Sequence, residues 1–382
     1  MNATALRINS AELFFYAACL RITPDGGMSG RFRSHPVTRH SLFRVGVTRD
    51  FLDNSGSLAY GDIGIDLLKA HPQVHADFLP DHHDSLPDSV GRDFDALLVL
   101  APRVTAETLS RSDRLTVIAR FGVGYDSVDV GACTNADVML TIAPDGVRRP
   151  VATSALALLF ALSHRLLQKD RLTREGRWNE KLHYMGIGLS GRTFGLIGFG
   201  NIGQEIARLS SPFEMQLVAH DPFADPDTAA RLGVRLVSLE QLLAESDFVC
   251  VCCSLTPTTR YLLKASQLEL MKPSAFLINV ARGPVIEQKS LTEALQRGRL
   301  AGAGLDVFET EPIASDDPLL KLDNVIVAPH AICWTDEMFR GIGRSACQSI
   351  LDVAEGRVPK DIVNRNVLER ASLQSKLARY RA

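Results

Sequence analysis

The hydrophobic positions of this chain fall into short runs that alternate with stretches of helical periodicity. Five apolar runs come first, at residues 43–47, 74–79, 96–100, 115–119 and 138–142, with helical patterns at residues 63–70 and 106–110. Seven further runs lie at residues 194–197, 215–219, 234–237, 248–253, 276–280, 302–307 and 325–328, with helices predicted at residues 239–244 and 291–298. Buried strands that alternate with helices are typical of parallel sheets with helices on both faces. The pattern predicts an α/β protein with two doubly wound parallel sheets.

Two longer stretches indicate how the sheets are connected. Residues 151–167 are almost continuously apolar but slightly too short to span a membrane, so they predict a long helix buried at a domain or subunit junction. A last helix near residues 337–355 and a strand at residues 362–363 lead the chain back to the first sheet.

The segment Gly198-Phe199-Gly200-Asn201-Ile202-Gly203 has the glycine spacing typical of dinucleotide-binding turns. It lies in the middle of the chain, so the first domain is expected to be interrupted by the second. We expect a flavodoxin-like substrate domain around a Rossmann NAD-binding domain, with a loosely ordered N-terminal extension and a short C-terminal tail. The expected bounds are 1–41 for the extension, 42–147 and 334–368 for the substrate domain, 148–333 for the NAD-binding domain and 369–382 for the tail.

A glycine-rich turn within residues 193–221 links a predicted strand to a helix. Gly198 permits the tight turn, Gly200 lets a pyrophosphate approach the backbone, and Gly203 lets the helix pack closely on the strand. The N-terminus of the helix, at Asn201 and Ile202, offers free N–H groups and a partial positive charge to phosphates. The segment therefore predicts dinucleotide binding.

Asp221 ends the strand that follows this helix, where a carboxylate can accept hydrogen bonds from an adenosine ribose. Pro222 and Phe223 follow it, without an arginine or lysine to neutralise a 2′-phosphate. Because a carboxylate repels that phosphate, the expected cofactor is NAD.

Composition narrows the class of protein. The chain has 382 residues, of which 46% are hydrophobic and 23% charged, with a net charge of −2 and no long basic run, which argues against a nucleic-acid partner. Seven cysteines are scattered, and Cys250, Cys252 and Cys253 share one strand without metal-ligand spacing. These features favour a cytoplasmic protein without a membrane partner; export directed by the apolar run at residues 13–20 is the less favoured alternative.

His82 and His83, flanked by Asp81 and Asp84, form the one cluster with metal-binding residue types. A solvated loop is the favoured interpretation, because charged residues are mostly exposed, and no metal is expected.

Three polar groups come directly after predicted strands in the second half of the chain. They are Asn279–Gly283, Gly304–Pro312 and Ala328–His330. In a doubly wound sheet, the carboxyl ends of the strands open onto the ligand crevice, so Arg282, Glu311 and His330 are expected to converge there. Taken singly, each also fits a simpler role, as a surface ion-pair partner, a loop carboxylate and a helix-capping residue.

The glycine motif, the NVARG segment, the LDVFETEP segment and the PH dipeptide occur in the order found in the D-isomer-specific 2-hydroxyacid dehydrogenase family, which residues 43–368 resemble. The resemblance implies that Arg282 holds the substrate carboxylate and polarises the carbonyl. It implies that His330 is the general acid for reduction and the base for oxidation, and that Glu311 orients the imidazole and favours its charged form.

The resemblance also implies the binding residues. Val280 and Ala281 would contact the cofactor, and Asp306 the nicotinamide carboxamide. The backbone at Gly122, Val123 and Gly124, together with the loop Pro102–Arg103–Val104, would receive the substrate carboxylate.

Departures from the family pattern concern the substrate pocket: a bulky Trp334 follows the histidine, the loop at Pro102 is short, and Thr153 stands where glutamate is common. The expected function is interconversion of a small D-2-hydroxyacid and its 2-oxoacid, as in hydroxypyruvate or glyoxylate reductases or phosphoglycerate dehydrogenases. A homodimer through residues 152–167 is also expected. Open alternatives are the same fold acting on phosphite or another small anion, and an NAD(H)-sensing interaction protein of the corepressor type.

Overall fold

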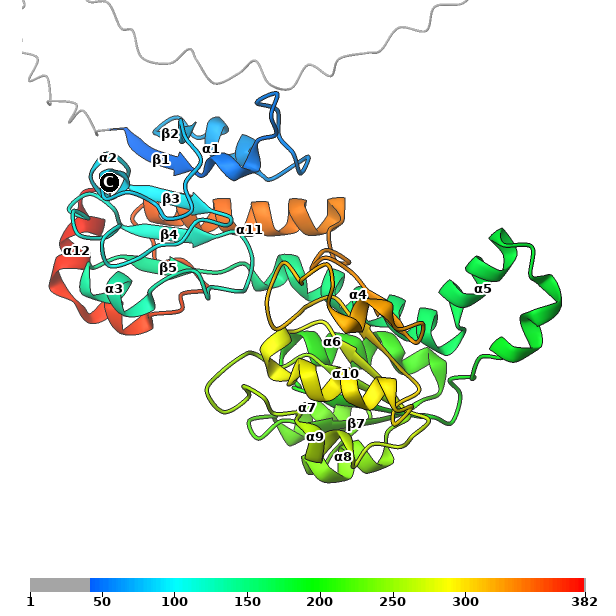
Figure 1. The fold of residues 1–382 in the computed structure, drawn as a ribbon. Helices are drawn as coiled ribbons and strands as arrows, with labels where there is room; N and C mark the ends of the chain where they lie inside the picture. The colour runs from blue at the N-terminus through cyan, green and yellow to red at the C-terminus, as the bar shows by residue number, and fades with distance from the viewer. Residues whose placement is uncertain (1–41, 381–382) are drawn as a thin grey trace, which may run out of the picture. The chain divides into compact units, whose positions relative to one another are not determined.

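The computed structural model describes residues 42–380, so the predicted extension, residues 1–41, lies outside the described residues. The first sheet has five parallel strands in the order β2-β1-β3-β4-β5 (Figure 1). Their bounds are Phe43–Val47 (β1), Val74–Phe78 (β2), Ala96–Val99 (β3), Val117–Arg120 (β4) and Met139–Thr141 (β5). This is the flavodoxin-like order, which confirms the predicted fold of the first sheet.

The second sheet has seven parallel strands in the order β12-β11-β10-β9-β6-β7-β8. Their bounds are Thr193–Ile197 (β6), Gln216–His220 (β7), Val234–Leu236 (β8), Phe248–Val251 (β9), Phe276–Asn279 (β10), Gly302–Leu305 (β11) and Val325–Val327 (β12). The order reverses between β6 and β9, as in a Rossmann sheet, so the glycine motif after β6 stands at the switch point. Both predicted sheets are confirmed.

Helices connect the strands of each sheet. Those between strands of the first sheet are η1 (Arg49–Phe51), α1 (Ile65–Ala70), α2 (Ser89–Asp93) and α3 (Val130–Asn135). Those between strands of the second are α6 (Asn201–Ser210), η3 (Ser211–Phe213), α7 (Pro226–Arg231), α8 (Leu239–Glu245), α9 (Ala265–Leu268), η4 (Gly283–Val285), α10 (Gln288–Gln296) and η5 (Pro318–Lys321).

The helix expected at residues 106–110 is not formed, and turns occupy these positions. The backbone N–H of Thr105 donates to the Thr108 hydroxyl, and the N–H of Thr108 donates to the Thr105 hydroxyl. Short polar side chains that bond nearby backbone groups in this way compete with helix formation.

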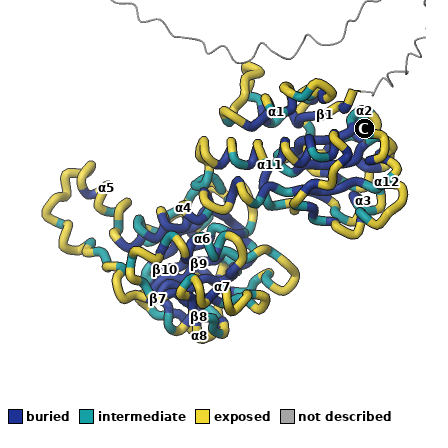
Figure 2. Tube along the Cα trace, turned by 180° about the vertical axis from the view of Figure 1, so that it is seen from behind, coloured by how far each residue is buried: buried dark blue, intermediate teal, exposed yellow. Residues whose placement is uncertain are grey.

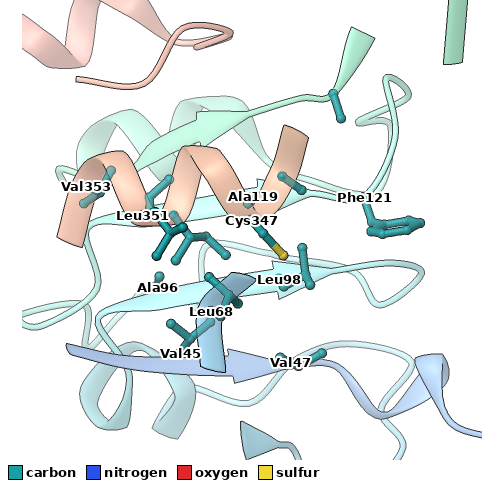
Figure 3. Packing of buried hydrophobic residues seen from close by; sticks show 14 of the residues in the cluster. Val45, Val47, Leu68, Ala96, Leu98, Ala119, Phe121, Cys347, Leu351 and Val353 are labelled. Atoms are coloured by element: carbon teal, nitrogen blue, oxygen red, sulfur yellow. The ribbon is translucent and has the colours of Figure 1, made fainter. Parts of the chain in front are cut away.

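The core of the first sheet is completed by α11 (Asp336–Ala354), as predicted for the last long helix. Figure 3 shows Cys347 and Leu351 of α11 over Leu98 and Ala119 of the sheet. All four are buried, so α11 belongs to the same core as strands more than two hundred residues earlier in the chain.

The long helix α4 (Pro144–Ser163) lies between the two cores. Val147 packs in the first core, whereas Ala152 and the apolar residues after it pack in the core that includes β6 and β9. Gly146 brings α4 against α11, because a Cβ at this position would meet the backbone of Ile342. The boundary between residues 147 and 148 falls within this helix, and the division into domains stays a prediction.

The apolar stretch at residues 151–167 does not form one helix. Arg165, with φ 52°, interrupts it before α5 (Leu166–Arg174), and η2 (Trp178–Tyr184) follows. In residues 42–380 no single helix is long and apolar enough to span a membrane; the α4–α5 pair, bent by 58°, passes that test by length and composition alone.

The chain ends on the first sheet. Ile362 forms an antiparallel bridge with Thr141, η6 (Arg365–Glu369) follows, and the expected tail contains a short helix, α12 (Ala371–Ala378). Leu373 and Leu377 of α12 are fully buried. The buried Lys376 donates hydrogen bonds to four backbone carbonyl oxygens.

Candidate active site

The glycine loop after β6 has the geometry of a phosphate cradle. Gly198 has φ +99°, and a Cβ there would stand 2.7 Å from the backbone of Cys253. A Cβ on Gly203 would collide with the carbonyl oxygen of Gly198, whereas one on Gly200 would enter open space. Gly200 caps α6 without a side-chain hydrogen bond, so the N–H groups of Asn201 and Ile202 at the start of the helix are available to an anion.

Asp221 follows β7, beside the glycine loop. Its Oδ2 accepts the N–H of Phe199 at 2.8 Å and its Oδ1 accepts the N–H of Phe223 at 2.9 Å. Because β6 and β7 are paired neighbours, Asp221 at the end of β7 lies next to the glycine loop, and the two hydrogen bonds fix its carboxylate there. A phosphate cradle beside a fixed carboxylate fits a dinucleotide with a free ribose 2′-hydroxyl.

His330 and Glu311 are brought together from the ends of β12 and β11. Nδ1 of His330 lies 2.8 Å from Oε2 of Glu311, and Oε1 of Glu311 accepts the N–H of Phe308 at 2.9 Å. Burial acts to raise the pKa of Glu311, but the hydrogen bonds from His330 and Phe308 and the charges of His330 and Arg282 outweigh it, so this pKa lies below its ordinary value. Glu311 is therefore a carboxylate at neutral pH.

The backbone of His330 has φ 57°, which is rare for a residue with a side chain. The buried carboxylate of Asp306 holds the next turn, accepting the N–H groups of Ala331 at 2.9 Å and Ile332 at 3.3 Å. Burial raises the pKa of Asp306, although these hydrogen bonds act in the opposite direction. Asp306, expected at the nicotinamide, thus anchors the histidine loop.

Arg282 follows β10 and faces the first sheet. Its Nη1 donates to the carbonyl oxygen of Ala281 at 2.7 Å, and its Nε lies 3.3 Å from Oδ2 of Asp126. A Cβ on Gly124 would collide with Nη2 of Arg282, so only glycine allows this approach. The buried Asn279 bonds the backbone of both Ala281 and Arg282 and fixes this turn.

Of the other predicted binding residues, Arg103, Gly122 and Val280 make backbone hydrogen bonds. The N–H of Arg103 donates to the carbonyl oxygen of Asp84 at 2.8 Å, and its side chain is exposed. Gly122 accepts the N–H of Ala143, while Val123 packs against the first core. Val280 donates its N–H to Val251, at the end of β9.

Trp334, which follows the histidine loop, belongs to a cluster of aromatic side chains. Its ring packs edge-on against Tyr60 at 5.5 Å and Phe339 at 5.6 Å between centroids. A cavity of about 360 Å³ is lined by His82 and His83 together with Asp50, Ala101 and Pro102 of the expected substrate loop region. No group of three or more His, Cys, Asp or Glu residues within the described range is arranged to hold a metal ion.

Four residues of this neighbourhood were given no role from the sequence: Asn279, Asp126, Asp50 and Arg120. Asn279 carried a signal, since it is the last residue of a strand directly before the predicted catalytic arginine. The other three are isolated polar residues in the first half of the chain. Only the folded structure brings Asp126 and Arg120 toward Arg282, and Asp50 toward Arg120.

A Rossmann sheet with a dinucleotide loop, beside a histidine paired to a carboxylate and an arginine, defines an NAD-dependent oxidoreductase. Residues 156–331 match the model of the D-isomer specific 2-hydroxyacid dehydrogenase NAD-binding domain. A glyoxylate reductase from Korarchaeum cryptofilum is 37% identical over 330 residues, which are 85% of this chain and 97% of that one. The chain belongs to the D-isomer-specific 2-hydroxyacid dehydrogenase family, and its cofactor is NAD.

Two further proteins define the extent of the similarity. A D-3-phosphoglycerate dehydrogenase from Archaeoglobus fulgidus is 37% identical over 72% of this chain, which spans only 52% of that enzyme. The crystal structure of the TT0316 protein from Thermus thermophilus superposes with a TM-score of 0.72 at 33% identity, over 84% of this chain and 99% of that one. The structural similarity to this protein therefore covers both sheets.

Proposed function

We propose that the chain reduces a small 2-oxoacid, glyoxylate to glycolate or hydroxypyruvate to D-glycerate, with His330 as the general acid. The observation that carries the proposal is the 2.8 Å hydrogen bond between Nδ1 of His330 and Glu311. Because Glu311 occupies Nδ1, the ring presents Nε2 to the substrate oxygen. Bound NADH supplies the hydride for the carbonyl carbon.

The two protonation states of His330 serve the two directions. In reduction, the imidazolium gives its Nε2 proton to the oxygen of the substrate, and the negative charge of Glu311 stabilises the imidazolium beforehand. In oxidation, the neutral ring accepts the hydroxyl proton at the same atom. Asp306 supports both directions by fixing the loop that carries the ring.

Arg282 is proposed to bind the substrate carboxylate. Its present partner, Asp126, has a side chain that is 65% exposed, and the pair is separated by 3.3 Å. Exposed pairs of this kind contribute little free energy, so a substrate carboxylate can replace Asp126 at the guanidinium at low cost. A planar guanidinium also binds a carboxylate in a defined orientation, which places the carbonyl near His330.

The proposal is tested by following NADH oxidation with a panel of 2-oxoacids that includes glyoxylate, pyruvate and hydroxypyruvate. Turnover of glyoxylate or hydroxypyruvate supports it. NAD⁺ reduction with phosphite and none with any 2-hydroxyacid would contradict it in favour of a small-anion enzyme. Tight NADH binding without any turnover would contradict it in favour of an interaction protein.

We also propose a homodimer, but through α5 and η2. Most of the apolar residues of α4 that suggested a contact are buried in the same chain. The segment that follows α4 is mostly exposed (Figure 2). Its exposed large hydrophobic residues are Leu166, Leu167, Trp178, Leu182 and Met185. Such a concentration is typical of interaction surfaces. Sedimentation should show a dimer that Leu182→Glu together with Met185→Glu dissociates; a monomeric wild type would contradict this.

The cytoplasm stays the proposed compartment. The cysteines of the described chain are free thiols, which fits a reducing environment.

A further inference from the structure

Two buried polar atoms at the carboxyl edge of the first sheet lack a hydrogen-bond partner within residues 42–380. They are Oδ1 of Asp50 and Nε of Arg120. Buried polar groups in proteins are normally paired, because an unpaired one retains the cost of its desolvation. Here an acceptor and a donor are both buried without a partner in the same region. They therefore indicate a role other than stabilising the fold.

Asp50 holds the loop after β3. It lies in η1, directly after β1, and its Oδ2 accepts the backbone N–H of Ala101 at 2.7 Å. Ala101 begins the loop whose residues 102–104 are expected to receive the substrate carboxylate. The carboxylate of Asp50 thus fixes the position at which that loop leaves the sheet.

Arg120 holds the loop after β4. It is the last residue of that strand, and its Nη1 donates to the carbonyl oxygens of Phe121 and, at 3.5 Å, Val99. A Cβ on Gly122 would stand 3.6 Å from the same nitrogen, so the guanidinium lies directly beside the second expected substrate loop, residues 122–124. Arg120 therefore ties this loop to the end of β3.

Arg120 lies in the electrostatic neighbourhood of both Asp50 and Arg282. Burial lowers the pKa of Arg120 to about 10, and the like charge of Arg282 lowers it too, whereas Asp50 and Asp126 raise it. Arg120 is still charged at neutral pH. Buried charges that are incompletely paired contribute little to stability and often reduce it, so the advantage of keeping them must lie elsewhere.

We propose that Asp50 and Arg120 are positioning residues that hold the loops at residues 101–104 and 122–124 in register for the substrate carboxylate. The proposal rests on the proposed function, because that function supplies the carboxylate. The two unpaired atoms are sealed from solvent, and the other polar atoms described above bond the loops, so these residues are assigned to act through the loops. All 2-oxoacids share the carboxylate, so loss of the pair affects them equally.

The first test follows the loops directly. Hydrogen exchange is measured by mass spectrometry for Asp50→Asn, Arg120→Met and the double variant, with Asp53→Asn as the matched control. Asp53 carries the same charge nearby but bonds a local turn at Ser55 and Ser57. Exchange at residues 100–104 and 121–124 should rise several-fold in the three variants, with α12 and the control unchanged. Unchanged exchange in these loops would overturn the proposal.

The second test measures kcat/KM for glyoxylate, pyruvate and hydroxypyruvate. The variants should lose about 10- to 100-fold, mainly through KM, by the same factor for each acid, because a small displacement of a binding group is enough for such a loss. The dissociation constant for NADH, measured by calorimetry, should not change. A loss confined to one acid would overturn the proposal, because it would mean direct contact with the substrate side chain.

The double variant separates positioning from stability. Removing both charges should return its melting temperature to that of the wild type or above, whereas kcat/KM stays low. Recovery of kcat/KM together with the melting temperature would overturn the proposal. If the wild type turns over none of the acids, the proposed function fails, and the exchange measurement still decides whether the pair holds the loops.

Discussion

Replacing Glu311 by glutamine removes one negative charge from the neighbourhood of His330 while keeping the size of the side chain and a hydrogen-bond acceptor. In the wild type, Oε2 of Glu311 lies 2.8 Å from Nδ1 of His330. The carboxylate stabilises the protonated imidazole, which is the form that reduction requires. In the variant, kcat/KM for reduction should therefore begin to fall at a lower pH.

The size of this effect follows from the geometry and the exposure of the pair. The side chains of His330 and Glu311 are 42% and 37% exposed, so water screens their interaction substantially. An exposed ion pair contributes at most about 1 kcal/mol, which corresponds to about 0.7 of a pH unit in a pH profile. The alkaline limb of the reduction profile should move down by about that amount.

The assay is a pair of profiles of kcat/KM against pH for the wild type and Glu311→Gln, with one 2-oxoacid and NADH. Glu309→Gln is the control, because Glu309 carries the same charge two residues away but bonds Tyr261 and Gln288. Its profile should superimpose on that of the wild type. Superimposable limbs for Glu311→Gln, or a shift to higher pH, would refute the pairing as described.

Three further predictions follow from the same site and fold. Arg282→Ala should raise KM and lower kcat together, because the arginine both binds the carboxylate and orients the carbonyl; a change in KM alone would contradict the second role. NADH should be preferred over NADPH, since Asp221 repels a 2′-phosphate, and comparison of kcat/KM for the two cofactors measures this. Lys376→Met should lower the free energy of unfolding in urea by about 2–4 kcal/mol, because four buried or part-buried carbonyl oxygens lose their donor; an unchanged urea midpoint would contradict this.

The strands could be predicted from the sequence because each is a short apolar run with polar or glycine-rich residues on both sides. Helix ends were harder to predict where one apolar run contains the junction between two helices. The run at residues 151–167 contains the junction between α4 and α5, which is set by the left-handed backbone of Arg165 and not by hydrophobicity. Only three residues of α12 are buried, too short a pattern for its helix to be recognised.

Some residues of the candidate site could also be predicted from the sequence, and others could not. Arg282, Glu311 and His330 could be selected because each follows a strand of one sheet, and parallel strands end at a common edge. Asp50 and Arg120 could not be selected, because their significance depends on contacts with loops and charges elsewhere in the fold. Asp306 illustrates an intermediate case, since its strand-end position was recognised but its bonds to the histidine loop were not.

The central claim, that His330 exchanges the proton with the substrate, is tested most directly by His330→Ala. The measurement is kcat/KM for reduction of the preferred 2-oxoacid across the pH range, with calorimetry of NADH binding to show that the variant is folded. We predict a fall of about 10²- to 10⁴-fold, loss of the alkaline limb and unchanged NADH affinity. A variant that keeps its rate within about tenfold of the wild type, or keeps the same limb, would contradict the account.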